Sequence, residues 1–124
     1  MTGSRELVVT AARAAAEKQA RDIILLDVRE LIVITDYFLI VSGTSDRQVR
    51  TIAEEIDKAV KVKAKGLKAV RREGEREGHW ALLDFVDFVA HVFLEEDRRF
   101  YELERLWSDA PTVDWEEAKA STGG

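Results

Sequence analysis

The chain has 124 residues, a mass of 14.1 kDa and a formal charge of −5, and this length predicts one domain with its own hydrophobic core. It has no cysteine, which excludes disulfides, thiolate catalysis, iron–sulfur clusters and cysteine–zinc sites. No apolar run reaches the roughly 18 residues needed to cross a bilayer, and no signal peptide is recognisable at the N-terminus. We therefore expect a soluble, cytoplasmic protein with no membrane partner.

The charges are unevenly distributed along the chain. Residues 58–78 carry 8 basic and 3 acidic side chains, whereas residues 79–124 carry 4 basic and 11 acidic ones. The acidic balance argues against a strongly basic nucleic-acid binder. The basic stretch leaves a weak RNA-binding module open as an alternative, although it lacks interleaved aromatic residues for base stacking. Its basic residues are Lys58, Lys61, Lys63, Lys65, Lys68, Arg71, Arg72 and Arg76.

The chain begins with a predicted helix and two predicted strands. Residues 4–20 place Leu7 and several alanines at helical spacing, with Ser4 as the expected N-cap. Residues 22–28 and 36–43 are short apolar runs typical of strands that are covered on both faces. Only about seven residues separate these runs, which is too few for a crossover helix, so we expect an antiparallel pair.

The next segment has the clearest helical pattern in the chain. Apolar residues recur three and four positions apart over residues 46–65, with charged residues on the opposite side. Ser45 followed by Gln48 has the spacing of a capping box, and Gly66 is a fitting C-terminal stop.

Three strands are predicted after this helix, over residues 67–72, 79–84 and 87–94, and short reversals between them predict a β-meander. Apolar side chains alternate onto both faces of the last two strands. One of these faces carries Trp80, Leu82, His91 and Phe93.

The C-terminal part predicts one helix and a tail. Residues 95–107 begin with acidic side chains and place Phe100, Leu103 and Trp107 at helical spacing. The domain is therefore expected to end at residue 109, with residues 110–124 as a flexible tail.

These elements predict an α/β fold of the mixed α+β kind, in which helices pack on a five-stranded mixed sheet. Three helices of modest length are not enough to cover both faces of such a sheet. We expect an uncovered apolar patch around Trp80 and Leu82, and patches of this kind usually bind a partner. The same patch predicts a homodimer when the protein is free.

Four aspartates at strand ends are compatible with metal-dependent nucleotidyl transfer: Asp27, Asp36, Asp84 and Asp87. The segment 42–45, Ser-Gly-Thr-Ser, lies at a helix N-terminus and is a conceivable anion seat. The closely spaced acid pair that such enzymes use on one strand is missing, and strand-end aspartates are more often turn formers and helix caps. We favour a non-enzymatic protein without metal or cofactor, and keep a nucleotidyltransferase-like nucleotide-binding protein as the alternative.

Three motifs resemble the ribosomal silencing factor family, also called RsfS or Iojap, in order over about residues 5–110. They are ITDYFLIVSGTSDRQVRTIAEEI (34–56), GHWALLDFVDFVAHVF (78–93) and FYELERLWSDA (100–110). The resemblance implies a non-enzymatic translation repressor with nucleotidyltransferase-like topology but without the catalytic acids. Members of the family bind the large ribosomal subunit through its protein fourteen and sterically block joining of the small subunit, lowering translation when nutrients are short.

The matching motif positions supply the expected partner-binding residues. We expect the acidic ones to pair with basic residues of the partner and the aromatic ones to act as anchors, with peripheral contacts to ribosomal RNA. The expected set is Trp80, Leu82, Asp84, Asp87, His91, Phe93, Tyr101, Glu104 and Trp107.

One position departs from the family pattern. The family usually has glycine in the corner Asp84-Phe85-Val86-Asp87, where this chain has Val86. A β-branched residue resists positive φ, so we expect either a different turn or stored strain at this corner.

Overall fold

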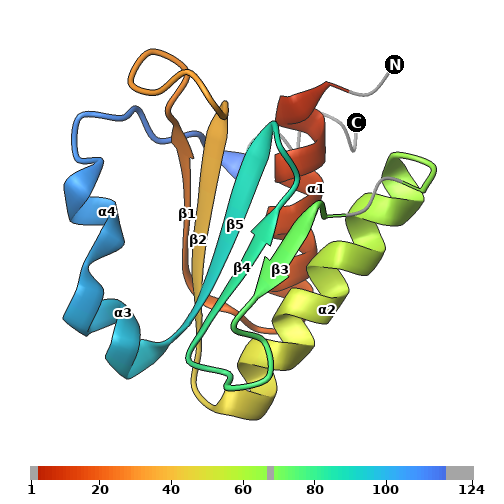
Figure 1. The fold of residues 1–124 in the computed structure, drawn as a ribbon, viewed down its shortest axis with the longest axis vertical. Coiled ribbons are helices and arrows are strands. Elements are labelled where there is room, and N and C mark those ends of the chain that lie inside the picture. The colour runs from red at the N-terminus through yellow and green to blue at the C-terminus, as the bar shows by residue number, and fades with distance from the viewer. Residues whose placement is uncertain (1–2, 67–68, 117–124) are drawn as a thin grey trace.

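A computed structural model describes residues 3–66 and 69–116, in which helices pack on one five-stranded sheet (Figure 1). In chain order the elements are α1 (Ser4–Glu17), β1 (Arg21–Asp27), β2 (Tyr37–Gly43), α2 (Asp46–Lys63), β3 (Arg71–Glu73), β4 (Trp80–Asp84), β5 (Phe88–Leu94), α3 (Glu95–Tyr101) and α4 (Leu103–Leu106). The strand order is β1-β2-β5-β4-β3. No helix in the described part of the chain is long and apolar enough to span a membrane.

The sheet is mixed, as predicted. β1 pairs with β2 antiparallel, and β3, β4 and β5 form the predicted antiparallel meander. Only β2 and β5 run parallel, because the long connection through α2 and the meander brings β5 back beside β2. β3 begins at Arg71, later than predicted, and residues 67 and 68 of the predicted strand lie outside the described residues.

Helix α1 ends at Glu17, three residues before the predicted end. Gln19, two residues after Glu17, takes a positive φ of 62°. The sequence predicts Ser4 as the N-cap of this helix, but the structure does not confirm this. Gly3 occupies that position, and the Ser4 hydroxyl instead donates to a carboxylate oxygen of Asp36 at 3.0 Å. This bond ties the start of α1 to the start of β2.

Helix α2 begins as its sequence predicts. The Ser45 hydroxyl accepts a hydrogen bond from the Gln48 backbone N–H at 3.1 Å. The Gln48 side chain does not complete the capping box. Its oxygen accepts from the Thr44 N–H at 2.6 Å, and its nitrogen donates to the Lys18 carbonyl at 3.1 Å. The cap thereby joins the N-terminus of α2 to the C-terminus of α1.

Two apolar clusters lie on opposite faces of the sheet. Helices α1 and α2 cover one face, where Phe88, Ala90 and Val92 of β5 are fully buried. On the other face Leu103 and Trp107, from α4 and its end, pack with side chains of β1, β2 and β5. The alternation of apolar residues predicted for β4 and β5 is therefore confirmed.

The single helix predicted over residues 95–107 is interrupted. Glu102 adopts a left-handed conformation with a φ of 46°, which ends α3 and starts the short α4 in a new direction. The helical spacing used for the prediction does not continue through this break. As a result Phe100 is 79% exposed, and of the three apolar residues used for the prediction only Leu103 and Trp107 pack on the sheet.

The flexible tail is predicted to start at residue 110, but residues 110–113 are held against β1. Ala110 is buried, the Pro111 carbonyl accepts from the Asp27 N–H at 2.8 Å, and the Val113 N–H donates to the Leu25 carbonyl at 2.8 Å. β1 is an edge strand, so its outer backbone groups are free to bind this segment. Residues 117–124 of the predicted tail lie outside the described residues.

We expect Gly74→Ala to lower the free energy of unfolding by about 2 kcal/mol or more, measured by urea denaturation. A Cβ at Gly74 would lie 1.9 Å from the Trp80 carbonyl oxygen, and its φ of 79° already disfavours a side chain. Gly66→Ala is the matched control, because Gly66 also has positive φ but a Cβ placed there would have no atom within 4 Å. Equal losses for both variants would contradict the steric explanation.

Candidate functional site

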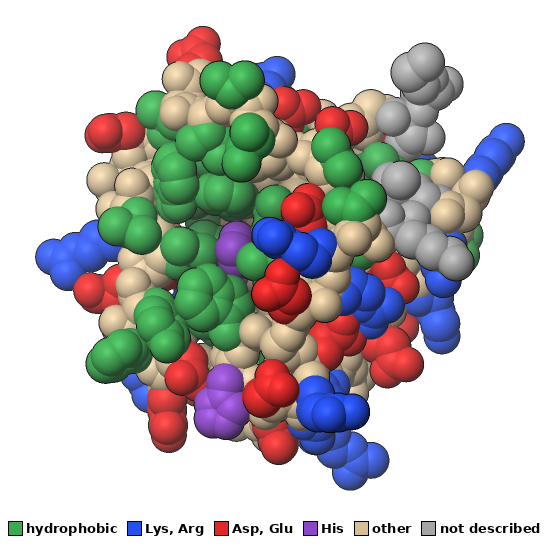
Figure 2. Space-filling model, in the orientation of Figure 1, with side chains coloured by type: hydrophobic (Ala, Val, Ile, Leu, Met, Phe, Trp, Pro, Cys, Tyr) green, Lys and Arg blue, Asp and Glu red, His purple; other side chains and the backbone are tan. Residues whose placement is uncertain are grey.

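The sheet face opposite α1 and α2 is only partly covered. Helices α3 and α4 lie beside β1 and β2, and the β4 side of this face remains open (Figure 1). Figure 2 shows apolar side chains gathered in one broad area of the molecular surface in this view. We call this exposed area the open face. Its apolar residues are Ile34, Trp80, Leu82, Val86, Val89 and Tyr101.

Trp80 is the central aromatic residue of the open face and is half-buried. Its ring centroid lies 4.7 Å from that of the buried Phe93 and 5.0 Å from that of Tyr101, which is 50% exposed. The Trp80 indole N–H donates to Nδ1 of His91 at 3.1 Å. These contacts hold the indole in one orientation, so its exposed part is already ordered before any partner arrives.

His91 lies buried beneath this aromatic group. Burial lowers the pKa of His91 from 6.5 to about 4, so the imidazole is neutral near pH 7. Because an indole N–H only donates, Nδ1 of His91 must be the unprotonated nitrogen and Nε2 carries the proton. Within the described residues, Nε2 has no hydrogen-bond partner.

A hollow of about 350 Å³ lies where the loop between β1 and β2 meets the corner between β4 and β5. We call it the corner hollow. The Asp84 carboxylate lines it, accepts from the Val86 N–H at 2.8 Å and lies 4.0 Å from the Arg71 guanidinium. Asp87 is exposed at the same corner. Two of the predicted acidic residues therefore flank the apolar surface.

Val86 takes a positive φ of 75° in this corner. The sequence predicted either a different turn or stored strain here, and the structure has the strained backbone. Its side chain is 53% exposed and lines the corner hollow. Val86 and Ile34 were both missing from the predicted site. Each lies in a turn or loop, where the spacing of apolar residues carries no information about exposure.

Three predicted partner-binding residues make contacts within the fold, and one of them is fully buried. Phe93 is fully buried, so it supports Trp80 from below and cannot touch a partner. The Glu104 carboxylate accepts from Nε of Arg98 at 2.8 Å. Trp107 is half-buried, with its ring 5.2 Å from the ring of Phe38, and it docks the end of α4 on the sheet.

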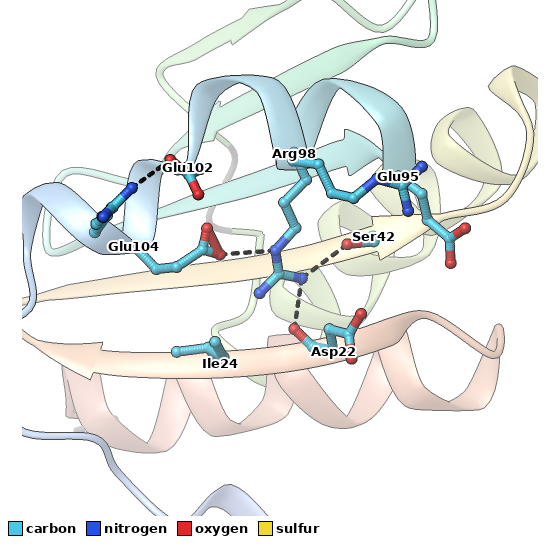
Figure 3. A pocket seen from close by; sticks show the side chains of 9 residues that line it. Asp22, Ile24, Ser42, Glu95, Arg98, Glu102 and Glu104 are labelled. Atoms are coloured by element: carbon cyan, nitrogen blue, oxygen red, sulfur yellow. Dashed lines mark hydrogen bonds and ion pairs between the residues drawn. The ribbon is translucent and has the colours of Figure 1, made fainter.

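Arg98 is the buried charge that anchors α3 to the sheet. Figure 3 shows its side chain reaching from α3 toward β1 and β2, at a pocket of about 530 Å³. One guanidinium nitrogen donates to the Ser42 hydroxyl at 2.8 Å and to the Asp22 carbonyl at 2.6 Å, while Nε donates to Glu104. Sequence reasoning missed this residue, because an arginine among acidic helical residues has the pattern of an exposed side chain.

Three of the four strand-end aspartates that raised the nucleotidyl-transfer alternative have side-chain partners within the chain, and Asp87 is exposed. The Arg29 side chain donates to both carboxylate oxygens of Asp27, at 2.9 and 2.6 Å, and these bonds lower the pKa of Asp27. Asp36 accepts from Ser4, and Asp84 holds the corner at Val86. Across residues 3–66 and 69–116, no three acidic or histidine side chains converge as metal ligands do.

The polar groups of residues 42–45, which were considered as an anion-binding site, form hydrogen bonds within the chain. The Ser42 hydroxyl is buried and accepts from Arg98, and the Ser45 hydroxyl caps α2. The Thr44 N–H and hydroxyl both donate to the Gln48 side-chain oxygen, at 2.6 and 2.9 Å. These groups stabilise the start of α2.

The described part of the basic stretch runs from α2 to the loop after β3 and is partly neutralised. Arg72 contacts Asp57 at 2.9 Å and Glu75 at 2.6 Å, and the Glu75 hydrogen bond raises the pKa of Arg72. Arg71 lies 3.0 Å from Glu73. Lys68, which belonged to the predicted basic set, lies outside the described residues.

A family model described as "Ribosomal silencing factor during starvation", RsfS, matches residues 2–123. The chain belongs to the RsfS family. The resemblance inferred from its three motifs is therefore confirmed.

Individual relatives agree with this assignment. The ribosomal silencing factor RsfS of Bacillus subtilis is 42% identical over 111 residues, which cover 89% of this chain and 92% of the relative. A crystal structure of a protein from Chromobacterium violaceum superposes with a TM-score of 0.81 and 32% identity, covering 86% of this chain and 88% of that one. A mouse protein named "Mitochondrial assembly of ribosomal large subunit protein 1" is 38% identical over 93 residues, 74% of this chain and 41% of the relative.

Membership gives this RsfS-family protein a ribosome-associated role in translation, in a family of regulatory proteins. The open face is the feature of the fold that suits such a role, because it offers binding surface without reactive groups.

We expect the free energy of unfolding to fall as the pH drops from 6.5 toward 4, by up to about 3 kcal/mol. The unfolded chain takes up a proton on His91 near pH 6.5, whereas the folded chain resists it until about pH 4, so low pH favours unfolding. Urea denaturation across this range measures the effect.

His91→Gln should flatten this pH dependence, because the glutamine oxygen still accepts from Trp80 but does not titrate. His79→Gln is the matched control at the exposed histidine, and the loss of stability assigned to His91 should remain in this variant. A stability that stays constant between pH 6.5 and 4 in the unsubstituted protein would contradict the assignment.

Proposed function

We propose that this RsfS-family protein binds the large ribosomal subunit through the subunit's protein fourteen and blocks joining of the small subunit. Translation is thereby repressed in the cytoplasm under nutrient limitation. The observation that carries the proposal is the open face, an exposed apolar and aromatic surface beside carboxylates in a chain of this family. No chemistry is needed, because a 14.1 kDa body on the joining surface excludes the small subunit by volume.

The aromatic part of the open face supplies the expected anchors. Trp and Tyr dominate the energetics of protein interfaces, and here the rings of Trp80 and Tyr101 pack with centroids 5.0 Å apart and planes tilted by 47°, with part of each residue exposed. Leu82 lies beside them on β4 and is half-buried. Their contacts with Phe93 and His91 order these side chains in advance, which reduces the entropy lost on binding.

The charge of the corner favours a basic partner. Asp84 and Asp87 flank the apolar residues, and the whole chain carries a charge of −5. Complementary charge speeds encounter and fixes the orientation of a complex more than it adds affinity. A ribosomal protein, which must itself lie among RNA phosphates, is the kind of basic partner that this surface suits.

The name of the mouse relative supports the choice of the large subunit over the small one. Peripheral contact with ribosomal RNA is a further part of the proposal. It would use exposed lysines of α2 such as Lys58, which lie away from the open face, and would weaken as salt is raised.

We expect the protein to travel with the large subunit in sedimentation at a magnesium concentration that allows joining, and the joined particle to disappear. Trp80→Ala and Asp87→Lys should each weaken large-subunit binding by about 1 to 4 kcal/mol, because both change exposed groups of the open face. Asp84→Lys should act in the same direction, although it also removes the hydrogen bond to the Val86 N–H.

Glu17→Lys is the matched control, since it makes the same charge reversal at an exposed position of α1, on the other side of the sheet and outside the α2 surface proposed for RNA contact. It should bind like the unsubstituted protein. If the protein stays at the top of the gradient and joining is unaffected, the proposed function is wrong. Unchanged binding by folded Asp87→Lys would remove that residue from the interface.

We also propose that two copies pair through the open face when no subunit is present. Light scattering at high protein concentration should then give twice the 14.1 kDa chain mass, and Tyr101→Glu should restore the monomer by placing a charge in the apolar contact. A mass of 14.1 kDa at every concentration would count against this pairing.

A further inference from the structure

Val86 occupies a backbone conformation that β-branched residues rarely adopt, with a φ of 75°. Its surroundings enforce this conformation. Phe85 is buried and stacks on Phe88 at 4.7 Å, while the Asp84 carboxylate accepts from the Val86 N–H at 2.8 Å. With Phe85 held in the core, Val86 is turned outward and its side chain is 53% exposed. Strain of this kind is often found where a side chain is presented for function.

The corner hollow lies directly beside this side chain. Its apolar lining comes from two separate parts of the chain, the loop between β1 and β2 and the strands β4 and β5. Ile34, at its edge, is 83% exposed. The apolar lining residues are Ile32, Ile34, Phe38, Leu82, Val86 and Val89.

Two buried polar atoms in the lining have no hydrogen-bond partner within the described residues: Oγ1 of Thr35 and Nε2 of His91. His91 is 6% exposed, and its Nδ1 is already used by the Trp80 indole. Nε2 therefore carries a proton that no acceptor in the described chain takes up. Burying a donor without an acceptor is unfavourable, so an occupant that brings an oxygen to this site is favoured.

An occupant reaches these atoms by displacing side chains at the mouth of the hollow. Arg71, which also lines it, is exposed, and among the described residues its side chain forms surface ion pairs with Glu73 at 3.0 Å and Asp84 at 4.0 Å. Exposed ion pairs of this kind contribute little, so the Arg71 side chain is free to move aside.

We infer that the corner hollow receives one apolar side chain of a basic protein partner, that Val86 packs over it, and that the His91 Nε2–H donates to an oxygen of the same segment. This inference rests on the proposed function. The exposed side chains of Ile34 and Val86 extend beyond the hollow, so an occupant that covers them is a protein segment and not a small molecule. The acidic Asp87 and the chain's charge of −5 favour a basic partner over a second copy.

The experiment is calorimetric titration of the full chain with purified protein fourteen of the large subunit. Val86→Ala and Val86→Gly should each bind about tenfold more weakly, because both remove the isopropyl group that packs on the partner. Val62→Ala is the matched control and should bind within twofold of the unsubstituted chain, since Val62 is equally apolar and 77% exposed on α2.

Urea denaturation of the same variants separates binding from folding. Val86→Gly should be more stable than the unsubstituted chain, because glycine relieves the strain at positive φ, and yet it should bind more weakly. Lower affinity in a more stable protein is not explained by loss of structure. If both Val86 variants bind as tightly as the unsubstituted chain, the inference is wrong.

The hydrogen bond has its own readout. In the free protein, long-range nitrogen–proton NMR correlations of the imidazole should show His91 protonated on Nε2, and the Nε2–H signal should move downfield when protein fourteen is added. An unmoved signal in a saturated complex overturns the role given to His91. Failure of the unsubstituted chain to bind at all would overturn the proposed function, and this inference with it.

Discussion

Apolar side chains alternate onto both faces of β4 and β5, and the rest of the molecule is arranged around this constraint. Successive strand residues point to opposite sides, so a strand that is apolar throughout needs cover on both faces. Helices α1 and α2 cover one face over its length. The second face has only α3 and α4, of 7 and 4 residues, and part of it around Trp80 stays exposed.

Arg98 decides which part of the second face is covered. Its guanidinium hydrogen-bonds to Ser42 on β2, to the Asp22 carbonyl on β1 and to Glu104 on α4, so the two short helices are held over the β1 and β2 side. A buried charge requires such partners, and removing the Glu104 carboxylate would leave it uncompensated. The β4 side is left open as a direct consequence, and the open face exists because the cover ends there.

The polar groups that resemble catalytic residues serve the fold in the same way. Asp27 is held by Arg29, Asp36 by Ser4, and the hydroxyl of Ser45 by the start of α2. The exposed apolar side chains, by contrast, gain nothing inside the chain. Burial against a partner would stabilise them, and this is the physical basis of the proposed function.

The sequence by itself determined the elements with a regular period, α1, α2 and the strands of the mixed sheet, and its motifs determined the family. Such patterns are local and repeat within a few residues. Only the tertiary structure decided that Phe93 is buried, that Val86 is exposed, that Arg98 is an anchor and that residues 110–113 cover β1. Each of these depends on which distant segment packs against the residue, and no spacing along the chain records that.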